Sequence, residues 1–175
     1  ISLRETLGAG SENSERTRKS TPTADLSFAF DPTSPSWKGL VAEGVTTVLL
    51  PAGSSQIAGG QAAIVSPAAG EVLKRNAVVT LGLSRSALGS STAPTSFAGL
   101  YAHLGEQFDA APEGSPLADA KAGKVPVMMR AVTRSEVSRA LDFAAAHGLK
   151  GAVLGAPEAD DLVDEIKASG LGVVF

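Results

Sequence analysis

Residues 124–175 read KVPVMMRAVTRSEVSRALDFAAAHGLKGAVLGAPEADDLVDEIKASGLGVVF, and this stretch decides the fold class. It alternates apolar segments with amphipathic ones, which predicts strands at 125–131, 150–155 and 171–175 and helices at 133–148 and 157–169. Thr133 and Glu136 form a capping box that starts the first helix, and Gly148 ends it. A strand–helix–strand–helix–strand order with short links predicts a parallel sheet with right-handed crossovers.

Upstream of this stretch the pattern is less regular. A helix is expected to open at Ser34-Pro35, to bury Trp37 and to end at Gly44. An apolar, β-branched segment follows at once, over residues 45–50, and predicts a strand buried on both faces. Further strands are expected at 62–65 and 77–83 with a turn at 67–70, and helices over 97–108 and from Ser115-Pro116. We expect residues 45–50, 125–131, 150–155 and 171–175 to be parallel neighbours in one sheet.

Composition narrows the function classes. Fifteen basic and eighteen acidic residues give a net charge of -3, which does not fit the basic face of a nucleic-acid-binding protein. The sequence contains no cysteine, so disulfides and thiolate metal sites are excluded. It has no apolar run near the ~20 residues that span a bilayer. No targeting signal is visible, and the compartment stays open.

The domain organisation predicted from these patterns has two parts. Residues 1–24 are rich in Ser, Thr, Glu and Arg, and are expected to form a flexible polar arm or loop. Residues 25–175 are expected to form a parallel TIM-barrel-type α/β domain. A complete barrel takes ~250 residues, so the chain would supply only part of one. We therefore expect another segment or chain to complete the barrel, in a homo- or hetero-oligomer.

Residues 43–54, EGVTTVLLPAGS, and residues 57–61, IAGGQ, resemble the imidazolonepropionase-like branch of the amidohydrolase superfamily. In that branch a helix ends in Gly, a Val-Thr-Thr-Val strand follows, and a Pro-Gly-Ser loop leads to an Ile-Gly-Gly-Gln segment. Residues 124–127 resemble the later barrel strand that brings a metal-binding His, and the similarity continues through residues 150–175. The resemblance implies a (β/α) barrel that hydrolyses C–N bonds other than peptide bonds, with zinc or iron held by His, Asp and sometimes a carboxylated Lys.

The sequence departs from that family at the metal ligands. The region before Leu26 contains no His, so the His-x-His pair of the first barrel strand has no counterpart. Arg130 and Val132 stand where the later strand has His. The chain itself is therefore expected to bind no metal cofactor. Two functions stay open: a binding or structural subunit that has lost metal catalysis, or an active hydrolase whose ligands lie on missing segments or on a partner chain.

The other residues that could serve in catalysis or metal binding have simpler structural explanations. His103 and His147 lack ligand spacing, and we interpret both as structural residues of helices. No Gly-x-Ser-x-Gly elbow marks a nucleophile. The acidic cluster of residues 158–165 is expected to offset a helix dipole.

The candidate ligand-binding residues are Arg130, Ser54, Gly59, Gly60 and Gln61. Arg130 is expected at the C-terminal end of a strand, where barrel enzymes place functional groups, so that it binds an anion or replaces the lost metal charge. The alternative is an Arg that extends into solvent. The Gly/Ser-rich loop of residues 51–61 is either an anion-binding loop or a tight connection in which small residues let backbones pass closely. We expect this loop and Arg130 to open on the same mouth.

Overall fold

The computed structural model describes residues 13, 15, 17–90 and 92–175. Its helical elements are η1 (Leu26–Ala29), α1 (Ser36–Ala42), η2 (Arg85–Ala87), α2 (Phe97–Asp109), α3 (Pro116–Lys121), α4 (Arg134–His147), η3 (Ala159–Leu162) and α5 (Val163–Ser169). Its strands are β1 (Val48–Leu50), β2 (Ala58–Ser66), β3 (Glu71–Gly82), β4 (Val127–Arg130), β5 (Gly151–Leu154) and β6 (Gly172–Val174). None of the helices in these ranges is long and apolar enough to cross a membrane.

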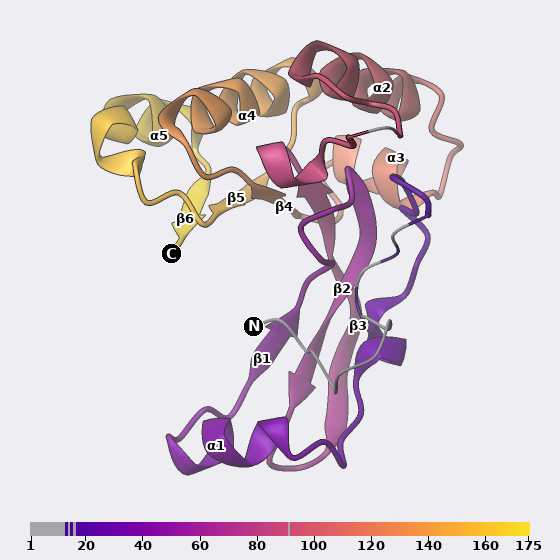
Figure 1. Cartoon of the computed structure of the whole chain (residues 1–175), viewed down its shortest axis with the longest axis vertical. Coiled ribbons are helices and arrows are strands. Elements are labelled where there is room, and N and C mark those ends of the chain that lie inside the picture. Colours follow the sequence, from indigo (N-terminus) through magenta and orange to yellow (C-terminus); the bar gives the residue numbers. More distant parts are fainter. Residues whose placement is uncertain (1–12, 14, 16, 91) are drawn as a thin grey trace.

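The six strands form one mixed sheet in sequence order, curled into half of a barrel (Figure 1). β1, β2 and β3 are antiparallel neighbours, whereas β3, β4, β5 and β6 are parallel. The parallel order predicted for the last three strands is confirmed. Figure 1 shows α2, α4 and α5 as a layer over one face of the parallel strands.

The main hydrophobic core lies between this helical layer and the parallel strands. Val127 and Met129 of β4 and Val153 of β5 are at most 1% exposed and point into it. The residues between them, Met128 and Arg130, are only half-buried on the opposite, inner face of the sheet. The inner face of the half-barrel therefore carries the candidate site, and the outer face carries the packing.

The signals predicted to start and to end α4 are both present. Thr133 and Glu136 make the capping box, and Gly148 adopts the left-handed conformation with φ of 65°. Gly44 likewise follows α1 with φ of 82°. These signals depend on local backbone geometry, which explains why they could be read from sequence.

The predicted parallel role of residues 45–50 was wrong. β1 covers only residues 48–50, pairs antiparallel with β2, and lies at the far edge of the sheet from β4. Parallel strands need a crossover of about a dozen residues or more, and only residues 51–57 separate β1 from β2. The neighbours of β4 are β5 and β3, and β3 is longer than the strand predicted at 77–83.

The long β2–β3 hairpin, β1 and α1 enclose a second hydrophobic core. Its buried members are Trp37, Val48, Leu50, Ala63 and Val65. Figure 1 shows this lobe extending away from the helical layer. The pairing of the hairpin changes register between Ala62 and Ile64, opposite Asn76 with its positive φ of 50°. Such a bulge bends and twists the paired strands, and this one lies between the two cores.

The prediction of a flexible polar arm over residues 1–24 falls partly on residues 1–12, 14 and 16, which lie outside the described residues. Residues 17–24 run beside the start of β2. The amide of Thr21 donates to the carbonyl of Ala58 at 2.7 Å, and the amide of Ile57 donates to the carbonyl of Lys19 at 2.7 Å. These bonds place residues 17–24 against the segment that leads into β2.

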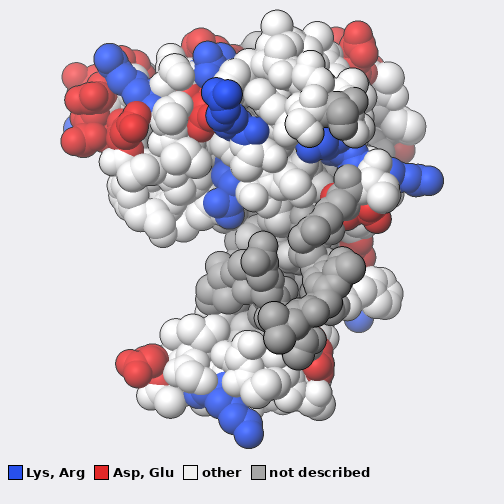
Figure 2. All heavy atoms as spheres, viewed as in Figure 1, with Lys and Arg blue, Asp and Glu red and all other residues white. Residues whose placement is uncertain are grey.

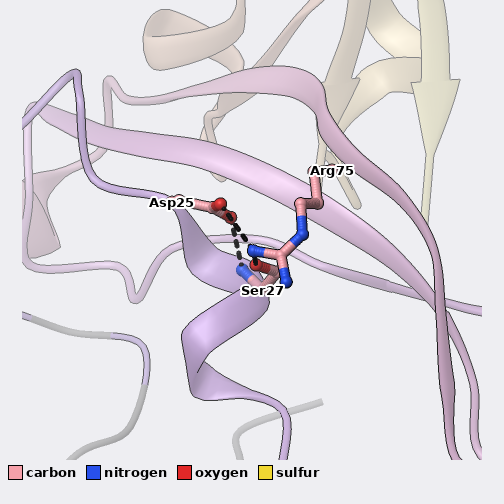
Figure 3. A network of polar contacts seen from close by, with 3 residues as sticks. All are labelled: Asp25, Ser27 and Arg75. Atoms are coloured by element: carbon pink, nitrogen blue, oxygen red, sulfur yellow. Dashed lines mark hydrogen bonds and ion pairs between the residues drawn. The ribbon is translucent and has the colours of Figure 1, made fainter.

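A polar network then joins this segment to the hairpin (Figure 3). Arg75 pairs with the carboxylate of Asp25 at 3.0 Å and also donates to the hydroxyl of Ser27. Burial raises the pKa of Asp25, but the hydrogen bonds from Ser27 and the charge of Arg75 outweigh it, so the pKa lies below its ordinary value. The network therefore holds η1 against the bulged part of β3.

Candidate functional site

A small cavity lies at the C-terminal ends of β3, β4 and β5, on the inner face of the sheet. Its walls include Arg130 at the end of β4, Leu154 at the end of β5, and Ser54 in the loop between β1 and β2. The enclosed volume is about 10 Å³, which is room for about one water molecule. The site is therefore a narrow recess whose walls come from strand ends and one loop.

The structure brings three of the five candidate residues together. Arg130, Ser54 and Gly59 line the cavity, whereas Gly60 and Gln61 do not. Gln61 pairs with Val79, which is level with Val127, so it lies three residues from Arg130 along the sheet. The amide of Gln61 is occupied by the carbonyl of Ala24 at 2.8 Å.

The sequence predicted Gly59 and Gly60 in the loop before β2, but both lie in β2 itself. A Cβ on Gly59 would lie 2.2 Å from Cβ of Ala52, and one on Gly60 would lie 2.5 Å from the carbonyl oxygen of Ala24. Both glycines therefore allow neighbouring segments to approach closely. This favours the interpretation of small residues that let backbones pass.

Arg130 is the charged group of the cavity. Its side chain is half-buried, and within the described part of the chain its guanidinium makes no hydrogen bond or ion pair. Its backbone carbonyl is fixed by the amide of Leu83 at 2.9 Å. The guanidinium of Arg130 is not among the buried polar atoms that lack a partner, so its donors are available to solvent or to an anion.

The other buried polar side chains of the cavity are already bonded. Gln56, which is 2% exposed, donates to the hydroxyl of Thr21 at 2.7 Å. Thr80, which is 6% exposed, donates to the carbonyl of Gly60 at 3.0 Å. Neither residue carries a signal in the sequence, because the role of each depends on which segments meet across the sheet. Their bonds hold the walls of the cavity in place.

The two histidines lie in the helical layer. His103 on α2 contacts the side chain of Gln107 at 2.9 Å, and the ring of His147 packs 4.3 Å from that of Phe143. Across the residues that the structure describes, no group of three or more His, Asp or Glu side chains could hold a metal ion. The described residues of the cavity therefore do not fit a zinc or iron centre.

The charged surface residues are interspersed on the face shown in Figure 2. Acidic side chains gather at the end of the molecule formed by η3 and α5, which carry Asp160, Asp161, Asp164 and Glu165. These residues occupy first helical turns, where negative charge is favoured by the helix dipole.

Comparison with known proteins yields a structural likeness. No protein-family model matches the chain, and no curated protein matches it. A crystal structure of an amidohydrolase from Thermotoga maritima MSB8 superposes with a TM-score of 0.77 over 95% of this chain, at 19% sequence identity. The match covers 52% of that protein, so this chain spans about half of its length. The chain thus has an amidohydrolase-like fold.

Proposed function

We propose that this chain is an amidohydrolase-like protein of the imidazolonepropionase-like branch, which binds a carboxylate or an amide at Arg130 and performs no metal-dependent hydrolysis itself. In this proposal it acts as a binding or structural subunit. The observation that carries the proposal is the guanidinium of Arg130 at the C-terminal end of β4, which has no partner among the residues that the structure describes. In parallel α/β sheets, ligands bind at this end of the strands.

The chemistry of the cavity supports an anion as the ligand. A guanidinium presents a planar set of donors that matches two carboxylate oxygens. The cavity has room for only about one water molecule, so a carboxylate would meet Arg130 at the cavity mouth, with at most one oxygen inside. The remainder of a larger ligand would lie over the half-buried Met128 and Leu154 on the inner face.

Arg130 to Ala is the direct test of this site. We expect the substitution to weaken the binding of acetate, followed by NMR on protein with labelled arginine side chains, by at least about tenfold, because a charge-assisted hydrogen-bonded pair is lost. Arg134 to Ala is the matched control, since it removes the same charge from an exposed position outside the cavity. Equal acetate affinity in wild type and the Arg130 variant would contradict the proposal.

The proposed loss of metal catalysis has its own test. Arg130 and Val132 stand at the positions where the family has His, and a guanidinium repels a divalent cation. We expect elemental analysis after dialysis to find far less than one equivalent of zinc or iron per chain. About one equivalent would overturn this part of the proposal.

We also propose that another segment or chain completes a parallel (β/α) barrel next to β6. Val174 is 41% exposed in this edge strand, and an unpaired strand edge is normally covered in a native protein. The chain also spans only about half of the Thermotoga amidohydrolase. Light scattering should therefore detect association of the chain with itself or with a co-expressed partner. A monodisperse monomer with a fully solvent-exposed edge at residues 171–175 would contradict the proposed assembly.

An active metal-dependent amidohydrolase is the alternative function. It is favoured by the same half-length match, because the missing ligands would then lie on the other half or on a partner chain. In that case the completed assembly, but not this chain alone, would contain stoichiometric metal and hydrolyse C–N bonds. Metal analysis of both samples separates the two functions.

A further inference from the structure

The loops at the C-terminal ends of the strands are joined by one buried carboxylate, that of Glu136. This side chain is only 4% exposed, and no cation pairs with it in the described part of the structure. Oε2 accepts from the amides of Val132 at 2.9 Å and Thr133 at 3.1 Å, within the β4–α4 corner. Oε1 accepts from the amide of Arg85 at 2.8 Å, in the loop that follows β3.

The loop after β3 links the end of β4 to the opposite wall of the cavity. The amide of Leu83 donates to the carbonyl of Arg130, and the amide of Arg85, two residues later, donates to Glu136. One residue further, the hydroxyl of Ser86 donates to the carbonyl of Ser54 at 3.0 Å. The β4–α4 corner, the loop after β3 and the wall that contains Ser54 thus form one connected chain of hydrogen bonds.

Lys19 reinforces the last connection in this chain. Its ammonium group donates to the carbonyls of Ser55 and Ala87, each at 3.1 Å. The segment before η1 is therefore bonded to both loops that border the cavity. The two walls can separate only if this chain of bonds breaks.

The capping role of residue 136 does not by itself require a carboxylate. A capping box accepts Glu or Gln at this position, since one side-chain oxygen is sufficient. Here both oxygens accept, and they accept from two different loops. A Gln amide offers one acceptor, and its NH₂ group would face a backbone N–H. A buried carboxylate is costly unless it is fully hydrogen-bonded, so its presence points to the connection between loops.

We propose that Glu136 is the positioning residue of the proposed anion site, and that it sets the separation between Arg130 and the Ser54 wall by fixing the loop after β3. The inference rests on the proposed function of Arg130. Glu136 touches no ligand in this arrangement and acts through the backbone amides of Arg85, Val132 and Thr133. Fixing a binding group with a buried second set of hydrogen bonds is how proteins keep a site in its productive geometry.

Two substitutions separate positioning from helix capping. Glu136→Gln should keep the cap of α4 and lose the bond to Arg85. Thr133→Ala should remove the hydroxyl half of the capping box and keep the bond to Arg85. We expect E136Q to raise the amide exchange rate of Arg85 about tenfold or more and to weaken acetate binding by several-fold, because a charge-assisted hydrogen bond is lost. T133A should destabilise the protein and leave the acetate affinity within about twofold, because α4 loses only its cap.

Each result decides the proposal. Equal acetate affinity in E136Q and wild type would overturn it, as would an equal loss of affinity in T133A. If E136Q does not fold, Ser86→Ala removes the next connection from an exposed loop residue and should weaken acetate binding in the same direction. Unchanged binding in S86A would then overturn the proposal.

Failure of the proposed function is distinguishable from failure of this inference. A wild-type protein that gives no acetate response contradicts the role of Arg130. The exchange data still decide the role of Glu136, since loss of protection at Arg85 in E136Q but not in T133A supports it. Equal protection at Arg85 in both variants and wild type overturns it.

Discussion

Tyr101 provides a test at the scale of a single residue, because it is the one tyrosine of the chain. Burial raises its pKa to about 12, which the nearby positive charge of Arg139 only partly offsets, and its hydroxyl has no partner within hydrogen-bond geometry among the described residues. The folded protein keeps the proton that the unfolded chain releases near pH 10. The contribution of Tyr101 to the free energy of unfolding is therefore fully present below pH 10. It falls by about 2–3 kcal/mol as the pH rises through 12.

Titration of the tyrosinate absorbance measures this pKa directly, and denaturant unfolding between pH 9 and 12 measures its effect on stability. Tyr101 to Phe is the control. It should be about as stable as wild type or more stable near pH 7, since it removes an unsatisfied buried hydroxyl, and it should lack the extra loss above pH 10. A folded protein whose tyrosine titrates near pH 10 would contradict the burial of this side chain.

At the scale of the element, the β4–β5 pairing depends on Gly151. A Cβ there would lie 1.9 Å from the carbonyl oxygen of Val127, and its φ of 145° is one that other residues rarely adopt. Gly151 to Ala should therefore lower the free energy of unfolding by about 3 kcal/mol or more, through backbone strain and loss of pairing. Gly172 to Ala is the matched control in β6, because its added Cβ would lie at an ordinary 3.6 Å from Ala152. Denaturant midpoints of the two variants should differ clearly, and similar midpoints would show that β4 and β5 are not packed as described.

At the scale of the whole molecule, the two hydrophobic cores differ in size. The core of the hairpin lobe has five buried members in the described structure, including Trp37, whereas the core beneath the helical layer is several times larger. The only tryptophan of the chain therefore reports on the smaller core. Because less apolar area is buried there, we expect Trp37 fluorescence to change at lower denaturant concentration than helical circular dichroism. Coincident transitions would show that the lobes unfold as one cooperative unit.

The sequence by itself determined the features that depend on local geometry. The strand–helix alternation of residues 125–175, the capping box at Thr133 and the glycine that ends α4 were predicted because each needs only neighbouring residues. Arg130 could be placed at a strand end for the same reason, from the length of one apolar segment.

Only the tertiary structure decided what meets across the sheet. β1 pairs back onto β2, and Gln61 lies away from the cavity, because strand partners and register depend on contacts between distant segments. The hydrogen bond between Glu136 and Arg85 also could not be predicted, since Arg85 is 51 residues away in sequence. A capping pattern states which amides of its own helix are satisfied. Which other loop comes within reach of the same carboxylate is determined by the packing of the whole half-barrel.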